Sequence, residues 1–574
     1  MTPVYLLSWC GSDGDVPDRE VAPIVRRQGL VELWHGDRAT LYGTANLPRR
    51  ALRAGRGIVI GSLFDKFGRS APDLLGTRER MFDPKTLLSD FWGAYVAVVE
   101  SPEGLSLLRD PSGGLACYAA SRDGRHYFTS EPRLLTDCGI VEPAIDWTMV
   151  LEALVRRDRR PRTTCLSGIT ELGPGLLLSL AGSARKETLV WDAASVARRA
   201  QGDGTVESLR EALTFTLGAW GRSSERPLVE VSGGLDSSIV AAGIAASNPQ
   251  TSLITFAPSP GDPDELPYAR ALAEHLGIPL HIARPDIADV DVGRSLAAGL
   301  PRPTARAFTQ SADALSLARA RSIGADAFFS GGGGDDVFGY LRSVAPVIDR
   351  FRAEGARAAA TTALDIARMN HATLWEVLAH LLERAWRRPP LIDRLDARLM
   401  ASDSVDQLPQ PAPSLPSTAL PPGKARHVEG IVTIHNYLEG HHRASFAPLL
   451  SPLLSQPIVE ACLAVSSWRW CEGGRNRAAA RAAFADRLPK VIVERRSKGS
   501  FDAFCARLLD RNRERILSML IDGSLAAHGL LDKAAVTGAL RHPSPPAGIV
   551  SRVLTLVDVE SWASAWDRPQ SQRA

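Results

Sequence analysis

The residues with the clearest chemical potential stand at 227–238, in the sequence PLVEVSGGLDSS. The apolar run at its start predicts a buried strand, and the apolar residues 239–246 after it predict a helix. Glycines between them let backbone N–H groups approach an anion, and the helix start adds N–H donors and a positive dipole end. We predict a phosphate cradle made of these residues: Val231, Ser232, Gly233, Gly234, Asp236, Ser237 and Ser238.

Asp236 is the unusual member of this cradle, because a carboxylate alone would repel phosphate. Its presence indicates a bridging cation, and Mg²⁺ is the natural candidate because it prefers carboxylate and phosphate oxygens. The alternative is a plain strand-to-helix turn in which Asp236 and the serines cap the helix. No Gly-x-x-x-x-Gly-Lys-Ser/Thr sequence occurs, so γ-phosphate chemistry of the kinase or motor type is not favoured.

The elements that must position this cradle alternate between strand and helix from about residue 204. Helical spacing over 206–220 leads into it, and residues 253–256 predict the next strand. A helix over 268–276 then ends at Gly277, and a third strand is expected over 278–283. This alternation predicts a parallel sheet with a ligand site at the carboxyl ends of its strands, where Thr255 and Phe256 stand.

The first 192 residues have a different sequence pattern. Short apolar runs alternate with turn residues, which predicts a β-rich sandwich. The expected strands are 4–7, 57–60, 94–99, 105–108, 127–129 and 175–180. Later in the chain we expect helices over 345–360, 362–369 and 374–384, and a mobile Pro-rich loop over 403–424.

Composition sets the broad class of the protein. The 574 residues are too many for one core, and 45% hydrophobic with 23% charged residues suits a soluble globular enzyme. A formal net charge of +3 gives no reason to expect binding to nucleic acid or a membrane surface. The 7 cysteines include no Cys-x-x-Cys pair, which favours a reducing, cytoplasmic location. We expect neither a signal peptide nor a membrane-spanning segment.

Two glycine loops carry a family resemblance. Residues 232–237 resemble the pyrophosphate loop of ATP pyrophosphatases, which split ATP between its α and β phosphates and adenylate a carboxyl or carbonyl oxygen. Residues 327–340, AFFSGGGGDDVFGY, closely resemble the SGEGSDEVFGGY loop of asparagine synthetases, whose Asp shares Mg²⁺ with the pyrophosphate-loop Asp. The resemblance implies that Asp236 and Asp335 hold Mg²⁺ and that Ser330 and Gly331 contact ATP. It also implies ATP at the carboxyl ends of the strands, with the adenine near Thr255 and Phe256.

The first half resembles the glutaminase half of the same family at 91–97, 108–114 and 127–131. Residues 166–175 and 191–192 resemble the sequence that joins the two domains of that family. The implied α/β fold has an Ntn-hydrolase-like β-rich sandwich domain over 1–195. An ATP-pyrophosphatase (adenine nucleotide α-hydrolase-like) parallel-sheet domain with a helical C-terminal extension follows over 204–574.

Two departures from the family pattern bear on activity. The family's amidotransferases place a catalytic cysteine directly after the initiator Met, where this chain has Thr2, and Cys10 is internal. The Arg-Gly-Pro-Asp and Asn-Gly-Glu glutamine-binding strings are also absent, so neither a glutaminase nor an N-terminal Thr nucleophile is favoured. Gly332 replaces the Glu of asparagine synthetases and the Tyr of β-lactam synthetases, which would leave space for a bulkier or peptidic acceptor.

The C-terminal part resembles the family at 443–452, 457–460 and 493–501. The last of these is similar to an R-x-K-x-x-F loop whose lysine contacts the phosphate and the developing negative charge, which implies that role for Lys498. We also expect Arg475, Arg477 and Arg481 to share one helix. No general base follows from the sequence; the candidates are Asp264, Glu265 and Glu376.

The pattern is most similar to the lasso-peptide macrolactam synthetase branch of the asparagine synthetase family. That branch implies adenylation of an Asp or Glu side chain and attack by the N-terminal amine of a core peptide. It also implies a precursor peptide substrate, a leader peptidase and a leader-recognition protein as partners. The alternatives are a β-lactam synthetase-like enzyme, an ammonia-dependent asparagine synthetase, and a scaffold that binds precursor peptide without ATP turnover.

Overall fold

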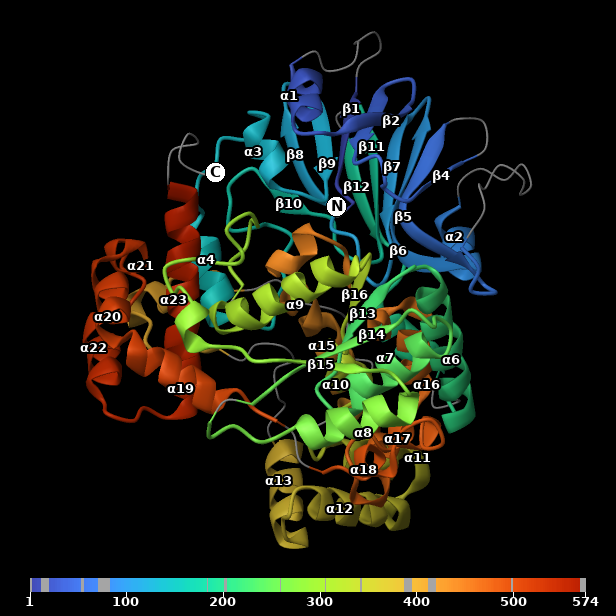
Figure 1. Ribbon diagram of the computed structural model, residues 1–574, viewed down its shortest axis with the longest axis vertical. Coiled ribbons are helices and arrows are strands. Elements are labelled where there is room, and N and C mark those ends of the chain that lie inside the picture. Colours follow the sequence, from blue (N-terminus) through green and yellow to red (C-terminus); the bar gives the residue numbers. More distant parts are fainter. Residues whose placement is uncertain are drawn as a thin grey trace.

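The computed structural model describes residues 3–11, 20–52, 56–70, 83–182, 184–200, 204–258, 260–304, 306–340, 343–386, 395–410, 420–496 and 499–567. Two antiparallel six-stranded sheets form its first part, at the top of Figure 1, with the orders β10-β8-β9-β1-β3-β2 and β12-β11-β7-β6-β5-β4. The strands are β1 Tyr5–Cys10, β2 Val31–His35, β3 Ala39–Gly43, β4 Arg49–Ala51, β5 Gly57–Asp65, β6 Phe91–Ser101, β7 Gly104–Arg109, β8 Tyr118–Arg122, β9 Arg125–Thr129, β10 Thr170–Glu171, β11 Leu176–Ala181 and β12 Ala184–Leu189.

Alternating side chains of these strands fill the space between the two sheets. Tyr5, Leu7 and Trp9 of β1 belong to one buried cluster together with Val96 and Val98 of β6. Because successive strand residues point to opposite faces, the odd-numbered residues of β1 enter this layer while Leu6 enters a different cluster. The period-2 pattern in the sequence thus becomes a sandwich core.

A five-stranded parallel sheet forms the second part, in the order β15-β14-β13-β16-β17. Its strands are β13 Pro227–Glu230, β14 Ser252–Phe256, β15 Leu280–Ala283, β16 Ala327–Phe329 and β17 Leu449–Leu450. The helices against it include α6 Val206–Arg222, α7 Leu235–Ala245, α8 Leu266–Leu276, α9 Gln310–Ile323, α15 Pro422–Thr433 and α16 Gln456–Ala464. Strand β13 pairs with β14 on one side and β16 on the other, so the strand order reverses beside β13, where such sheets bind ligands.

Helices after residue 344 complete the fold (Figure 1). They are α11 Ala345–Glu354, α12 Ala356–Met369, α13 Leu374–Trp386, α14 Ser402–Asp406, α17 Ala478–Ala483, α18 Lys490–Val493, α19 Asp502–Arg511, α20 Arg513–Asp522, α21 Ser524–Ala527, α22 Lys533–Arg541 and α23 Ala547–Asp567. Helix α23 shares a buried cluster with the first half: Val553 and Trp562 join Leu151 of α4, Trp147–Val155, and Tyr118 of β8. The two ends of the chain therefore share one core.

The predicted fold class is confirmed, since antiparallel sheets precede a parallel sheet covered by helices. Two local expectations were wrong. The helix expected over 345–360 ends at Gly355, whose φ of +84° takes the backbone out of the helical region. Part of the loop expected over 403–424 is helical, because 403–406 lie in α14 and 422–424 begin α15; residues 411–419 lie outside the described part.

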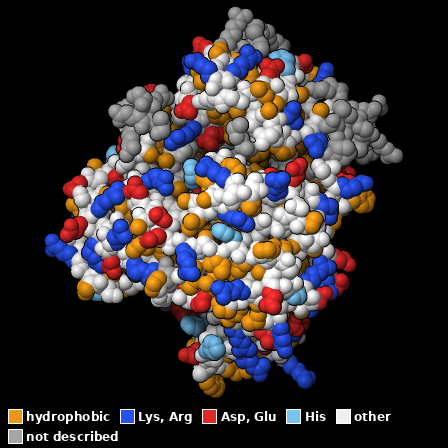
Figure 2. Space-filling model, in the orientation of Figure 1, with side chains coloured by type: hydrophobic (Ala, Val, Ile, Leu, Met, Phe, Trp, Pro, Cys, Tyr) orange, Lys and Arg blue, Asp and Glu red, His pale blue; other side chains and the backbone are white. Residues whose placement is uncertain are grey.

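Charged side chains of both signs are interspersed over the face shown in Figure 2, as the small net charge suggests. In the part of the chain that the structure describes, no helix combines the length and apolar character needed to cross a bilayer.

Candidate active site

The predicted phosphate cradle joins β13 to α7. Gly233 adopts a φ of +69°, and Gly234 is the N-cap residue of α7. The loop is held by its own hydroxyl groups: Ser232 N donates to Ser237 Oγ at 3.2 Å, and Ser238 Oγ donates to the carbonyl of Gly234 at 2.7 Å. Ser238 is fully buried, so its hydroxyl serves the loop itself, whereas Ser232 and Ser237 line a pocket.

The second glycine loop follows β16 and packs directly against the first. A Cβ atom added to Gly331 would lie 2.6 Å from the backbone N of Ser237, and one added to Gly334 would lie 2.4 Å from Cβ of Asp236. Both distances are too short for any side chain, so glycine at these two positions allows the loops to touch. The two glycine-rich sequences, about a hundred residues apart, therefore form one structure.

Asp236 and Asp335 converge on a single cation, Arg477. Its Nη1 lies 2.8 Å from Oδ2 of Asp236 and 2.7 Å from Oδ1 of Asp335. Arg477 is the N-cap residue of α17 and has a φ of +55°, which is uncommon for a non-glycine residue and marks a constrained backbone. Its guanidinium also lies 5.3 Å from the ring centre of Tyr340.

This arrangement fits a shared Mg²⁺. The metal is usually held by one or two carboxylates together with substrate phosphates and waters, and two carboxylates meeting at one positive group supply that donor set. Among the described residues, no group of three or more His, Cys, Asp or Glu forms a metal site. Any Mg²⁺ here would therefore complete its shell with phosphate and water oxygens.

A pocket of about 360 Å³ lies at the carboxyl ends of β13, β14 and β16. The predicted ATP residues that line it are Val231, Ser232, Gly234, Asp236, Ser237, Thr255, Phe256, Ser330 and Gly331. Gly233 and Ser238 lie in the loop but not on the pocket wall, and Asp335 joins through Arg477. The structure thus brings the predicted nucleotide residues to one edge of the sheet.

Several arginines line this pocket, some of them next to the glycine loops. Arg495 donates to the carbonyl of Gly233 at 3.0 Å and to Oε1 of Glu265 at 2.6 Å, and it lies 4.1 Å from the ring centre of Tyr268. Burial and the neighbouring Arg477 lower the pKa of Arg481 to about 10, so it stays charged at neutral pH. The site therefore combines N–H donors with cations that suit polyphosphate.

The expectation that Arg475, Arg477 and Arg481 share a helix was wrong. Only Arg481 lies within α17, Ala478–Ala483, while Arg477 caps it and Arg475 precedes it. Sequence reasoning noticed these arginines but gave none of them a role at the metal pair, because their partners are more than 100 residues away. Arg443 was likewise missed; it pairs with Glu230 at 2.9 Å and with Asp313 at 3.4 Å.

Part of the pocket wall is apolar. It contains Phe256, Pro258, Pro263, Pro285, Phe308, Phe501 and Phe504. Phe308 and Phe501 form a tilted aromatic pair with ring centres 6.4 Å apart. Such a wall can stack a base or hold an apolar part of a second substrate.

Gly332 does not leave the open space that the sequence suggested. A Cβ atom at this position would lie 3.2 Å from Oγ of Ser451 and 3.4 Å from Oγ of Ser330, so two hydroxyls flank the place of the family's larger side chain. Gly332 itself does not line the pocket. The chemical difference is therefore a pair of neutral hydroxyls where asparagine synthetases have a carboxylate.

Two predicted positions, Thr2 and Lys498, lie outside the described residues. Among the candidate bases, Glu265 lines the pocket but is paired with Arg495, and Asp264 accepts a hydrogen bond from Leu266 N within its own turn. Glu376 is exposed on α13 and bonds to Thr373. None of the three is poised as an obvious base.

The described thiols of the first half are all buried, at Cys10, Cys117, Cys138 and Cys165. Burial raises the pKa of Cys117 to about 11 and that of Cys165 to about 12. A thiol with such a pKa is protonated at neutral pH and is a poor nucleophile. These two cysteines therefore have no activated thiolate.

Comparison with known proteins gives the site its context. A family profile described as asparagine synthase matches residues 208–568, which is more than half of the chain. No curated protein sequence matches. Among solved structures, a glutamine phosphoribosylpyrophosphate amidotransferase from B. subtilis complexed with ADP and GMP matches with 10% identity, a TM-score of 0.23, and coverage of 57% of this chain and 90% of that chain.

A second solved structure, described as the allosteric regulatory enzyme of purine biosynthesis, matches with 13% identity and a TM-score of 0.20. It covers 57% of this chain and 83% of that chain. Both structural similarities are too weak to bear on activity, whereas the family profile spans both glycine loops and the C-terminal helices. The chain therefore belongs to the asparagine synthase family, whose chemistry is the ATP-dependent formation of amide bonds.

Proposed function

We propose that this chain forms a macrolactam ring in a ribosomally made lasso peptide. It would adenylate the side-chain carboxyl of an Asp or Glu with ATP, releasing pyrophosphate. The N-terminal amine of the same core peptide would then attack, forming an isopeptide bond and releasing AMP. The proposal includes a division into a sandwich domain over 1–195 without glutaminase activity and a synthetase domain over 204–574.

The proposal rests on a contrast between the two halves. The second half has a pocket at its glycine loops, whereas the described cysteines of the first half are all buried. Ammonia released from glutamine requires an activated nucleophile, and Cys117 and Cys165 are the opposite of activated. We therefore propose that the attacking amine belongs to the acyl substrate itself, because such an amine needs no second binding step. The apolar part of the pocket wall with Phe308 and Phe501 also suits a peptide better than free aspartate.

The residues divide the work by their positions. The N–H groups around Ser232 and Gly234, with Arg477 and Arg495 nearby, would bind and orient the phosphates. Charge develops on the leaving pyrophosphate and on the acyl oxygen, and preorganised donors stabilise it without rearrangement. Lys498 would add a cation at that stage, as the family resemblance implies. Asp236 and Asp335 would hold Mg²⁺, which when bound neutralises phosphate charge.

The experiment is pyrophosphate release by the full chain with ATP and Mg²⁺. The acids to compare are a synthetic peptide panel with a free N-terminus and one internal Asp or Glu, the same peptides with Asn or Gln, and aspartate with ammonium chloride. The proposal predicts release only with the acidic peptides. Release only with aspartate and ammonium would favour an asparagine synthetase instead, and binding of peptides without any release would favour a scaffold.

The proposed partners follow from the same reaction. A core peptide becomes available for cyclisation only after its leader is removed, so we propose a leader peptidase and a leader-recognition protein acting beside this enzyme in the cytoplasm. A genome carrying this chain without a neighbouring short precursor-peptide gene would count against the lasso assignment.

A further inference from the structure

A second cavity, of about 310 Å³, lies beside the nucleotide pocket, and Phe308 lines both. Its walls come from α4 and the loop after it, from the segment before α9, and from α19 and α23. Tyr437, which is 42% exposed, also lines it. Its volume is within the range of small-ligand sites, and no predicted site residue lies in it.

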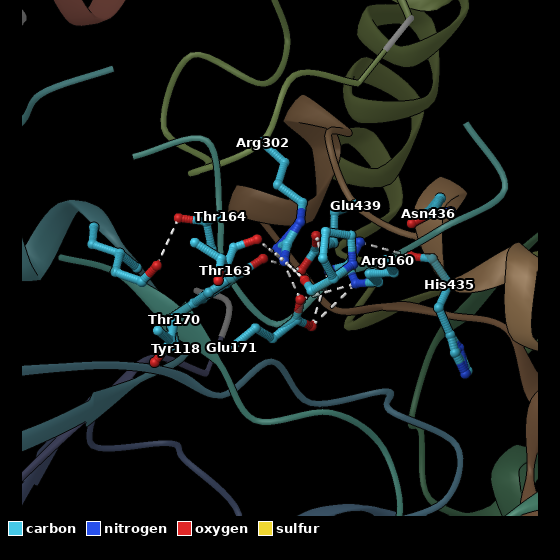
Figure 3. A network of polar contacts seen from close by, with 12 residues as sticks. Tyr118, Arg160, Thr163, Thr164, Thr170, Glu171, Arg302, His435, Asn436 and Glu439 are labelled. Carbon is cyan, nitrogen blue, oxygen red and sulfur yellow. Dashed lines mark hydrogen bonds and ion pairs between the residues drawn. The ribbon is translucent and has the colours of Figure 1, made fainter. Parts of the chain in front are cut away.

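The charged residues that line this cavity are all basic. The residues lining it include no Asp or Glu but five arginines: Arg157, Arg159, Arg160, Arg302 and Arg306. Two of these arginines form ion pairs with acidic residues that do not line the cavity. Figure 3 shows Arg160 and Arg302 pointing to Glu171, with Nε of Arg160 at 2.9 Å and Nη1 of Arg302 at 3.0 Å from Oε2. Glu439 lies 2.8 Å from Nη2 of Arg160.

Arg306 has no such ion pair within the described residues. Its Nε and Nη2 atoms are buried and have no hydrogen-bond partner among the described residues. Asp313, Asp558 and Glu439 influence it electrostatically, but within the described chain none of them comes close enough for an ion pair with it. Burial, and next Arg443, lower the pKa of Arg306 to about 10, which leaves it charged at neutral pH. A buried cation with unsatisfied donors is costly unless an anion binds it.

A second polar group in the same wall is also unsatisfied. Thr304, only 8% exposed, has a buried Oγ1 without a hydrogen-bond partner in the described structure. The rest of the cavity is largely apolar, with walls from Met149, Ala153, Leu154, Leu554 and Val559. The cavity therefore suits a ligand with one anionic group attached to an apolar body.

We propose that this cavity, the Arg306 cavity, binds a carboxylate-bearing apolar segment of the peptide substrate, separate from the carboxyl that is adenylated. The proposal rests on the peptide substrate proposed above. Arg306, whose buried donors have no partner in the described structure, would repel the N-terminal amine of the peptide, so the carboxylate end is the part that fits. The nucleotide phosphates already have the glycine loops, and the apolar walls disfavour a hydrated inorganic anion. Phe308 between the two spaces would let one peptide reach both.

Direct binding tests this without turnover. The probe is the tripeptide Ala-Leu-Phe with a free C-terminal carboxylate, compared with its C-terminal amide and with inorganic pyrophosphate, by calorimetry on the full chain. We expect the carboxylate form to bind at least tenfold more tightly than the amide. Arg306→Ala should weaken carboxylate binding by about 10- to 100-fold, the worth of a hydrogen bond to a charged group.

Two further variants and one control complete the design. Arg306→Lys should retain part of the affinity, and Thr304→Val should lose less than Arg306→Ala. Arg352→Ala, on the exposed side of α11, should bind like the wild type. Thermal melting of Arg306→Ala checks that the variant folds, since the nearby Asp558, Asp313 and Glu439 lose the charge of Arg306.

Equal binding of carboxylate and amide, or unchanged binding by Arg306→Ala, would overturn the proposal. So would Arg306-dependent binding of pyrophosphate in place of the peptide. These results are independent of the pyrophosphate-release assay. A wild type that releases pyrophosphate with acidic peptides but shows no Arg306 effect refutes the cavity alone. Arg306-dependent carboxylate binding without any release refutes the macrolactam function alone.

Discussion

In the parallel-sheet half, paired acids and arginines lie at the edge of a pocket, whereas Arg109 and Glu171 of the sandwich are buried against each other. Asp236 and Asp335 meet Arg477 at the edge of a 360 Å³ pocket. Arg109 of the sandwich is 3% exposed and donates hydrogen bonds to Glu171 and to three backbone carbonyls. The same residue types thus prepare a site for ligands in one half and close the structure in the other.

The sandwich acids confirm this inward use. Asp110, which lies in the stretch that resembles the glutaminase motif, accepts hydrogen bonds from Tyr95 N at 2.9 Å and Ser112 N at 2.7 Å. Burial raises its pKa to about 6. Asp110 therefore has a structural role in this fold, because its carboxylate binds the backbone of two neighbouring segments.

The largest effect that would sharpen this contrast is expected at Glu171. Glu171→Gln leaves Arg109, Arg160 and Arg302 without their shared carboxylate, and we expect a loss of about 3–5 kcal/mol in the free energy of unfolding. Urea unfolding at pH 7 measures it. The exposed pair Arg26–Glu32 supplies the control, since Glu32→Gln should cost less than about 1 kcal/mol.

The pH dependence of the same variant gives an independent check. Burial alone would raise the pKa of Glu171, but Arg160, Arg302 and Arg109 outweigh it and hold that pKa well below its ordinary value. Its stabilising contribution is therefore complete above the unfolded-state pKa of about 4.3 and is lost as the pH falls below it. Wild type and Glu171→Gln should converge in stability in acid, and parallel curves down to the lowest pH would contradict the ion network.

The next effect concerns the parallel-sheet half. Asp236→Asn combined with Asp335→Asn should lower pyrophosphate release by about 100-fold or more, because a metal-binding pair contributes several kcal/mol to transition-state stabilisation. Folding, followed by thermal melting, should change little by comparison. Asp123→Asn, at an exposed sandwich turn, is the control. Unchanged release by the double variant would show that the pair only anchors Arg477.

A smaller effect is expected where the glycine loops touch. Gly334→Ala brings a Cβ atom 2.4 Å from Cβ of Asp236 and should destabilise the protein by about 1–3 kcal/mol while lowering activity. Gly538 of α22 has no atom within 4 Å of an added Cβ, so Gly538→Ala should be neutral or slightly stabilising. Thermal melting of both variants compares the two, and equal melting temperatures would mean that the loops separate freely.

The smallest effect is expected at Cys10, buried at the end of β1. Cys10→Ala should leave pyrophosphate release within about twofold of the wild type, because a packing residue contributes to stability and not to chemistry. A complete loss of glutamine-dependent product in this variant, with ammonia-dependent product retained, would instead assign a glutaminase to the sandwich.

Much of this fold could be predicted from the sequence where apolar runs were long and bounded by glycine. The strands around Val96 and Leu107 and the cradle at Gly233 are examples. Strands with polar or exposed residues were not predicted. Strand β2 carries the exposed Glu32 and His35, and β12 carries Arg185, Lys186 and Glu187. Their pairing depends on neighbouring strands and not on their own composition.

The site could also be predicted only in part, where its residues form local sequence patterns. Glycine and Asp patterns are local, so Asp236 and Asp335 could be paired on family resemblance, and the structure brings them together. Arg477 joins them from 142 residues beyond Asp335, and no local pattern reports such a contact. The Arg306 cavity was invisible for the same reason, since its walls come from well-separated segments.

In the proposed reaction, the attacking amine belongs to the acyl substrate. Mass spectrometry of the product tests this directly, with the full chain, ATP, Mg²⁺, an acidic core peptide and ¹⁵N-labelled ammonium chloride. We expect a product that has lost one water, contains no ¹⁵N, and does not form from the N-acetylated peptide. Incorporation of ¹⁵N into a side-chain amide would contradict it and make the chain an ammonia-dependent synthetase.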